Sequence, residues 1–520
     1  YNRSFGLHNV TAMAMVLARK GFSSVSSMFR NSFDSEILDQ INAGNTDGQT
    51  MNAVDSETAR ASYMARVNYN YASKYLVEFN IRRDGSENFA PDKRWGTFAS
   101  ASLGWVISEE PFFESLKNTI NFLKLRGSYG TLGNDNTGGV SFPFYSRFEL
   151  YQGAVASNGF MNNLGDYAFG DLVTKGLVPG AIANSLATWE KSNKANIAMD
   201  ATLFNNLNFT VDLFTERRTN ILTQRTAEVP SSFGGTLPLE NIGIVNNKGI
   251  DLSLNYHNSI GKVNYSVGGN FTFARNKIVE MAEAEGTSEY MRQTGRPING
   301  YYGYKTDGIF QSQEEIDNYA KQEVAGAGYD TQIGDIKYVD IDGNGVVNSD
   351  DMTYLGYGNI PEIIYGINGS LNWKNFDFSF LMQGAAHAQV YLKGGIILPY
   401  FNQGNLPQFW VNEAWTEENP SNRYPRLAES VHNFPATDVP GVQTYLYNAS
   451  YLRLKNIEIG YTFPTSWLSR IGVTSARVYV NAQNLFTISD VPQIDPENTE
   501  QEGWTYPQMK SFNFGLSLQF

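Results

Sequence analysis

The sequence predicts an all-β fold, a transmembrane antiparallel β-barrel, and three observations lead to this prediction. Apolar and polar residues alternate along many short segments of the 520-residue chain, as they do in strands with two different faces. Short turns alternate with long connections between these segments. No apolar run approaches the roughly 18 residues of a membrane helix, but the strands of a barrel are only half apolar and escape that test.

The last segment, Ser511 to Phe520 (SFNFGLSLQF), shows the alternation most clearly. Its apolar residues occupy every second position, and small or polar residues lie between them. A soluble sandwich would bury the apolar face in a core, whereas an outer-membrane barrel would turn it to lipid and the polar face to the lumen. The segment alone leaves both folds open, and the remaining elements decide between them.

The same alternation recurs along the chain, and we expect about 14 to 16 strands of about 8 to 12 residues, a length that suits a tilted membrane strand. His8 to Arg19 is the first expected strand. Tyr63 to Tyr71 and Tyr75 to Ile81 form an expected hairpin with one apolar face and one face of Arg, Glu and Asn side chains. In a wide barrel such a charged face lines water. The later expected strands lie within 99–107, 123–129, 195–203, 207–213, 250–256, 263–273, 363–373, 376–382 and 478–482, followed by the last segment.

The connections between these strands fall into two classes. Tight turns are expected at Ala72 to Lys74, Asn205-Asn206, His257 to Lys262 and Lys374-Asn375. Long connections run from about Thr131 to Asn193, Arg218 to Lys248, Asn276 to Pro361, and Gly384 to Ala449. Outer-membrane barrels have short turns at one end and long loops at the other. Loops of this length are uncommon in compact soluble domains unless they are functional, so the connections favour the barrel.

The composition excludes several classes of protein. A formal net charge of −13 disfavours a nucleic-acid partner, which would require a basic surface. The absence of cysteine argues against a disulfide scaffold or a thiolate metal site. The first residues, YNRSFGLHNV, hold neither an initiator Met nor a signal-peptide pattern, so we expect a chain that begins within a larger protein.

Six separate strings resemble the barrel of SusC/RagA-type TonB-dependent transporters of Bacteroidota, in the same order and over nearly the whole chain. They are Arg82 to Phe113, Leu123 to Asn134, Glu240 to Tyr256, Gly334 to Asp351, Tyr451 to Pro464 and Ala476 to Asp490. The resemblance implies a barrel of about 22 strands. Residues 1–520 would be the C-terminal portion of this transmembrane barrel, with long extracellular loops and without the plug.

The resemblance also implies a function, which is active TonB-dependent import of an oligomeric nutrient, a glycan or an oligopeptide, across the outer membrane. It implies no enzymatic step. The implied partners are outer-membrane lipid, a SusD-like surface lipoprotein that caps the barrel, and TonB-ExbB-ExbD acting through a segment absent from these residues. Other function classes stay open: a passive porin, an outer-membrane enzyme or binding barrel, and a soluble carbohydrate-binding β-protein.

One acidic segment, Asp340 to Asp351, matches the spacing of a calcium loop of about twelve residues. Oxygen ligands fall at alternate positions, with Gly345 where a sharp turn is needed. The expected ligands for Ca²⁺ are Asp340, Asp342, Asn344, the carbonyl of Val346, Asn348 and Asp351. An EF-hand has Glu at the last position, and the shorter Asp weakens the match. A calcium loop and an acidic turn without metal both stay open.

No catalytic set is apparent in the sequence. The four histidines are scattered, and no serine lies in a nucleophile-elbow context. The segment from Gly384 to Ala449 instead holds aromatic and amide side chains, which suit sugar rings and peptides. The predicted substrate-binding residues are Asn402, Gln403, Phe409, Trp410 and Trp415. The alternative is that these side chains form a small core within the loop itself.

Overall fold

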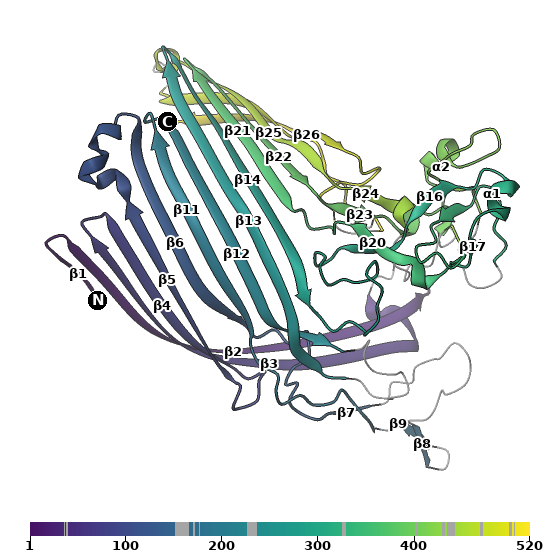
Figure 1. The fold of residues 1–520 in the computed structure, drawn as a ribbon. Helices are drawn as coiled ribbons and strands as arrows, with labels where there is room; N and C mark the ends of the chain where they lie inside the picture. Colours follow the sequence, from purple (N-terminus) through teal and green to yellow (C-terminus); the bar gives the residue numbers. More distant parts are fainter. Residues whose placement is uncertain are drawn as a thin grey trace. The chain divides into compact units, whose positions relative to one another are not determined.

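The computed structural model describes residues 1–35, 37, 40–150, 166–169, 172–175, 177–225, 237–324, 329–401, 404–428, 432–433, 442–468, 472–498, 502–503 and 505–520 (Figure 1). The chain separates into two compact units. Unit one comprises Tyr1–Leu103, Ser128–Asn193 and Thr219–Ile242. Unit two comprises Gly104–Gly127, Lys194–Arg218 and Gly243–Phe520.

The segments in which apolar and polar residues alternate form one 15-stranded sheet, in which neighbouring strands follow each other in sequence order. This confirms the all-β prediction and the expected number of strands. The strands are β1 (Asn2–Phe5), β2 (His8–Phe33), β3 (Gly44–Tyr71), β4 (Tyr75–Ser86), β5 (Trp95–Val106), β6 (Ile120–Asn134), β11 (Glu190–Leu203), β12 (Leu207–Gln224), β13 (Leu239–Ile260), β14 (Val263–Glu280), β21 (Ile363–Trp373), β22 (Phe376–Ala386), β25 (Tyr451–Thr462), β26 (Ser475–Ser489) and β27 (Ser511–Gln519).

Short elements occupy the connections between these strands. The helices are α1 (Gln313–Asp317), α2 (Gln408–Glu413) and α3 (Thr465–Leu468). Within the described residues, no helix is both long and apolar enough to cross a membrane. The short strands are β7 (Phe148–Leu150), β8 (Asp166–Phe169), β9 (Leu172–Lys175), β10 (Leu177–Pro179), β15 (Tyr301–Tyr304), β16 (Thr306–Ile309), β17 (Lys321–Gln322), β18 (Ile336–Tyr338), β19 (Val346–Val347), β20 (Met352–Gly356), β23 (Gln389–Tyr391) and β24 (Leu446–Asn448).

The tight turns are where the sequence predicts them, with one correction. β21 and β22 are joined by Lys374 and Asn375, as expected. The predicted turn from His257 to Lys262 is too long, because β13 stays paired with β14 up to Ile260. Gly261 adopts a φ of +61°, which lets two residues reverse the chain.

The strand predicted from His8 to Arg19 continues to Phe33, which makes β2 26 residues long. β4 pairs with β3 only as far as Arg60, and beyond that point β2 and β3 form a two-stranded ribbon that ends at Phe33 and Gly44 (Figure 1). The residues of β2 in this ribbon, 22–29 (FSSVSSMF), do not alternate between apolar and polar, so the predicted strand is too short.

The two faces of the sheet differ in chemistry, which unit two shows clearly. Apolar side chains on β27 are exposed, and Phe514 is 81% accessible. On the opposite face, Arg477 of β26 forms ion pairs with Asp377 of β22 and with Glu458 of β25. These strands of unit two therefore carry one apolar face and one polar face, as predicted from the alternation.

The two longest connections of unit two share one hydrophobic core. It joins residues between β14 and β21 to residues between β22 and β25. Tyr338, Trp410 and Tyr445 are fully buried at its centre. The long loops are therefore folded structures. Their shared hydrophobic core holds them together, in addition to the strands from which they extend.

Candidate functional site

The acidic segment folds into a compact turn built from its own side chains. One carboxylate oxygen from each of Asp340, Asp342 and Asp351 lies within 4.8 Å of the other two. Asp340 accepts amide hydrogen bonds from Gly343 at 2.7 Å and from Gly345 at 2.9 Å. Burial acts to raise the pKa of Asp340, but the amide hydrogen bonds from Gly345 and Gly343 outweigh it and lower the pKa below its usual value.

The other predicted ligands also accept hydrogen bonds from the backbone. Asp351 is fully buried, and its two oxygens accept from the amides of Ile341 at 2.7 Å and Asn348 at 2.8 Å. The Asn344 oxygen accepts from the Val346 amide at 2.8 Å. Hydrogen bonds of this kind stabilise an acidic turn by themselves. Calcium binding by the six residues stays a prediction.

The predicted substrate-binding aromatics lie in the core of the long loops. Trp410 on α2 is fully buried, and its indole N–H donates to the carbonyl of Ile397 at 2.7 Å. Phe409 packs on Tyr424 with ring centroids 5.1 Å apart. Trp415 is partly exposed and donates to Gln311 Oε1 at 2.9 Å.

The structure therefore brings Phe409, Trp410 and Trp415 together in the loop core, which is the alternative left open by the sequence. Asn402 and Gln403 lie outside the described residues. Contact of any of these five residues with a substrate stays a prediction.

A buried polar cluster that the sequence did not reveal helps to hold these loops. Asp335 is fully buried and accepts hydrogen bonds from Arg426 Nε at 2.7 Å and Asn433 Nδ2 at 2.8 Å. His432, also fully buried, contacts the carbonyl of Ile336 at 2.8 Å through Nε2. Burial is the largest cause of a lowered pKa at the His432 imidazole.

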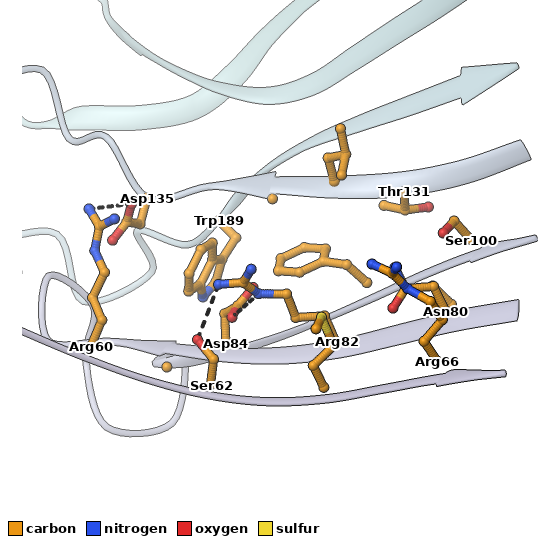
Figure 2. A pocket seen from close by; sticks show the side chains of 16 residues that line it. Arg60, Ser62, Arg66, Asn80, Arg82, Asp84, Ser100, Thr131, Asp135 and Trp189 are labelled. Atoms are coloured by element: carbon orange, nitrogen blue, oxygen red, sulfur yellow. Dashed lines mark hydrogen bonds and ion pairs between the residues drawn. The ribbon is translucent and has the colours of Figure 1, made fainter. Parts of the chain in front are cut away.

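Unit one contains a polar pocket on the inner face of its strands. Arg60, Ser62 and Arg66 on β3 pair with Ser86, Asp84 and Asn80 on β4, so their side chains share one face. Ser100 from β5, Thr131 from β6, Asp135 and Trp189 also line the pocket (Figure 2), and so does Phe98 from β5. Together with the chain around them, these residues enclose about 460 Å³. The pocket has room for a group the size of a sugar or an amino acid.

Two of the three arginines in this pocket have acidic partners. Arg60 pairs with Asp135 at 2.9 Å. Arg82 pairs with Asp84 at 2.6 Å and donates to Ser62 Oγ at 3.2 Å. Arg66 has no ion pair within the described part of the chain, and its buried Nε has no hydrogen-bond acceptor there. The pocket lining therefore carries one more positive charge than negative charge.

The sequence pointed to part of this pocket and missed the rest. The alternation places Arg66, Arg82 and Asn80 on the polar face of the predicted hairpin. Asp135 and Trp189 come from later segments of the chain. The alternation along a strand shows which face a residue lies on, but it does not show which distant residues lie beside it in the fold.

The long meander of strands, with one apolar face and one charged face, has the features of a transmembrane β-barrel. The profile of the family described as TonB dependent receptor-like, beta-barrel matches residues 5–301. The chain belongs to this family.

Related proteins support this placement and confirm the resemblance to SusC/RagA-type transporters. TonB-dependent receptor P3 of Formosa agariphila is 29% identical over 100% of this chain and 51% of its own length. TonB-dependent receptor SusC of Bacteroides thetaiotaomicron is 30% identical over 88% of this chain and 43% of its own length. This chain thus spans about half the length of these relatives. Both relatives are named as TonB-dependent receptors.

The fold also matches solved structures. The structure of the RagAB peptide transporter aligns with a TM-score of 0.74 and 24% identity, over 100% of this chain and 54% of that chain. The RagAB peptide importer in its open-open state aligns with a TM-score of 0.75 and 23% identity. At this identity the likeness shows the fold alone.

Proposed function

We propose that this chain forms part of the barrel of an active importer that takes an oligomeric nutrient, a glycan or an oligopeptide, across the outer membrane. The observation that carries the proposal is membership of the TonB-dependent receptor-like barrel family. The polar inner face supports it, because a hydrated cargo needs hydrogen-bonding and charged groups along its path. The RagAB structures are of a peptide transporter, and they leave the class of cargo open for this chain.

The proposed partners are TonB-ExbB-ExbD, which supply the energy, and a SusD-like lipoprotein that caps the barrel from outside. The loops that share the hydrophobic core of unit two are the proposed surface for the lipoprotein. A folded loop surface suits a stable interface better than a flexible one, because less conformational entropy is lost on binding. In the same loops, the partly exposed Phe409 and Trp415 are the proposed contacts for cargo.

Uptake of labelled oligosaccharides and oligopeptides by cells with the full-length protein tests this function. We expect uptake that disappears when the gene is deleted, when TonB is absent, or when the proton gradient is dissipated. Uptake that survives the loss of TonB and of the gradient would show a passive porin instead. Purification from the native membrane should also yield a bound lipoprotein, and its absence would remove the lipoprotein from the proposal.

We also propose that the Asp340–Asp351 turn binds Ca²⁺. Three carboxylate oxygens already converge there, and Ca²⁺ accepts six to eight oxygen ligands in flexible geometries. Calorimetric titration of the full-length protein with calcium and with magnesium tests this, with Asp342→Asn as the variant. A measurable heat for calcium that D342N reduces is expected. Equal, negligible heats in both proteins would leave a turn held by hydrogen bonds alone.

A further inference from the structure

We propose that the pocket around Arg66 binds an oxyanion on the cargo, either a carboxylate or a sulfate ester. This inference rests on the proposed import function and narrows its cargo to oligomers that carry such groups. The pocket faces the polar side of the sheet, where a cargo in the lumen would pass. Its unpaired guanidinium is the only charge in the lining without an opposite charge among the described residues.

Arg66 differs from its two neighbours in how it is held. Arg60 and Arg82 are each fixed by an aspartate, and Arg82 by a serine as well. These ion pairs leave their guanidinium groups largely occupied. Arg66 has donors available in a planar fork, and that geometry matches the two oxygens of a carboxylate or a sulfate.

Asn80 completes the site with an acceptor. It pairs with Arg66 across β3 and β4, and its Oδ1 is buried without a donor in the described chain. Figure 2 shows Arg66 and Asn80 side by side, on the side of the pocket that also carries Ser100 and Thr131. A ligand that brings an oxyanion together with a hydroxyl or N–H donor would give Arg66 and Asn80 the partners that they lack among the described residues.

The pocket lining offers a ligand polar groups in preference to apolar surface. Ser100 carries a hydroxyl, and the Thr131 hydroxyl, which donates to Asn193 Oδ1 at 3.0 Å, can still accept a hydrogen bond. The aromatic rings of Phe98 and Trp189 are themselves buried, at 5% exposure each. An apolar cargo group would therefore find little open aromatic surface. The chemistry favours a hydrated, charged group on the cargo over an apolar one.

The test is a titration of the full-length protein, purified with any lipoprotein that accompanies it, against four probes. They are oligogalacturonate, its neutral methyl ester of equal length, a sulfated oligosaccharide and oligoglutamate. We expect wild type to bind at least one anionic probe about tenfold more tightly than the neutral ester, with a preference that weakens as salt rises. The probe that binds best identifies the source of the oxyanion.

Two variants localise this preference to the pocket. Arg66→Gln removes the charge, and Asn80→Asp places a carboxylate beside Arg66 that should neutralise it within the fold. Both should reduce the preference for the anionic probe to about that of the neutral ester. Arg66→Lys should retain part of it, because the charge remains while the planar fork is lost.

The matched control is Arg83→Gln, the same substitution one residue after Arg82 on β4. Arg83 is exposed on the opposite face, where it lies over the ring of Trp95. The Arg83→Gln variant should therefore leave the preference for the anionic probe unchanged.

The proposal is overturned if wild type shows no preference for any anionic probe, or if R66Q retains the full preference. A loss of thermal stability in R66Q with unchanged binding would also overturn it, by showing that Arg66 pairs with another part of the full-length protein. Failure of TonB-dependent uptake in cells would remove the import function but would leave this binding result standing.

Discussion

Replacing Gly460 with alanine should break an ion pair that spans three neighbouring strands of unit two. Arg477 on β26 reaches across β25 to Asp377 on β22, and it also contacts Glu458 at 2.6 Å. Gly460 lies on β25 directly between them, paired with Asp377 in the sheet. An added Cβ would lie 2.5 and 2.6 Å from the two carboxylate oxygens of Asp377, and it would clash with the guanidinium as well.

The expected cost follows from how exposed these charges are. The side chains of Arg477, Asp377 and Glu458 are 28%, 30% and 26% exposed, so water screens part of their interaction. Breaking a fully buried pair costs about 3–5 kcal/mol, and an exposed pair is worth about 0–1 kcal/mol. Arg477 keeps Glu458 after the substitution. We therefore expect the free energy of unfolding to fall by about 1–2 kcal/mol.

Guanidinium unfolding of the full-length protein in lipid vesicles measures this change. Gly127→Ala is the matched control, because a Cβ there would meet only the Asn196 carbonyl oxygen at 3.8 Å. In an Arg477→Gln background the cost of Gly460→Ala should shrink to below about 0.5 kcal/mol, since the pair is already lost. An equal cost in both backgrounds would refute the reasoning, because the penalty would then come from the strand itself.

Three further predictions concern the two faces of the sheet, the hydrophobic core of the long loops and the buried His432. Phe378→Arg on the outer face should cost about 2–4 kcal/mol near the membrane midplane, whereas Ser379→Arg on the inner face should be mild; vesicle unfolding compares them, and equal tolerance would contradict the assigned faces. Trp410→Ala should destabilise the loops by about 3–5 kcal/mol and expose them to limited proteolysis, while an unchanged cleavage pattern would show that the core is dispensable. Because burial lowers the pKa of His432 in the folded loops, the unfolded loops bind a proton more readily. Loop stability should therefore be full above a pH of about 6.5, fall as the pH drops through that value, and level off below the folded pKa. Hydrogen exchange between pH 8 and 5 should show this slope in wild type and lose it in His432→Gln; the same slope in both proteins would assign it to other groups.

Local features of the fold could be predicted from the sequence because their causes are local. The turn at Lys374 and Asn375 follows directly from two alternating segments that meet there. The acidic turn from Asp340 to Asp351 is likewise built from hydrogen bonds within a few residues. Interactions between residues that are close in the chain can be predicted from a single sequence.

Contacts between distant segments could not be predicted in the same way. Asp335 meets partners 91 and 98 residues away, Arg426 and Asn433, and alternation says nothing about such pairs. Trp410 carries an aromatic ring that suits either a sugar or a core, and only the packing around it shows that it is buried. Arg66 could be placed on the polar face, but the sequence could not show that Asp84 and Asp135 pair with other arginines and leave Arg66 without an acidic partner among the described residues.

The ribbon of β2 and β3 has a mechanical consequence. It is held at its base, where Glu87 accepts a hydrogen bond from the Ala59 amide at 2.7 Å, just beyond the last residue of β3 that pairs with β4. From Lys20 to Phe33, β3 is the described partner of β2, over a length of about 45 Å at about 3.3 Å per residue. A rotation of about 10° at the base of a ribbon this long displaces its tip by about 8 Å, so a small twist at the base becomes a large displacement at the tip.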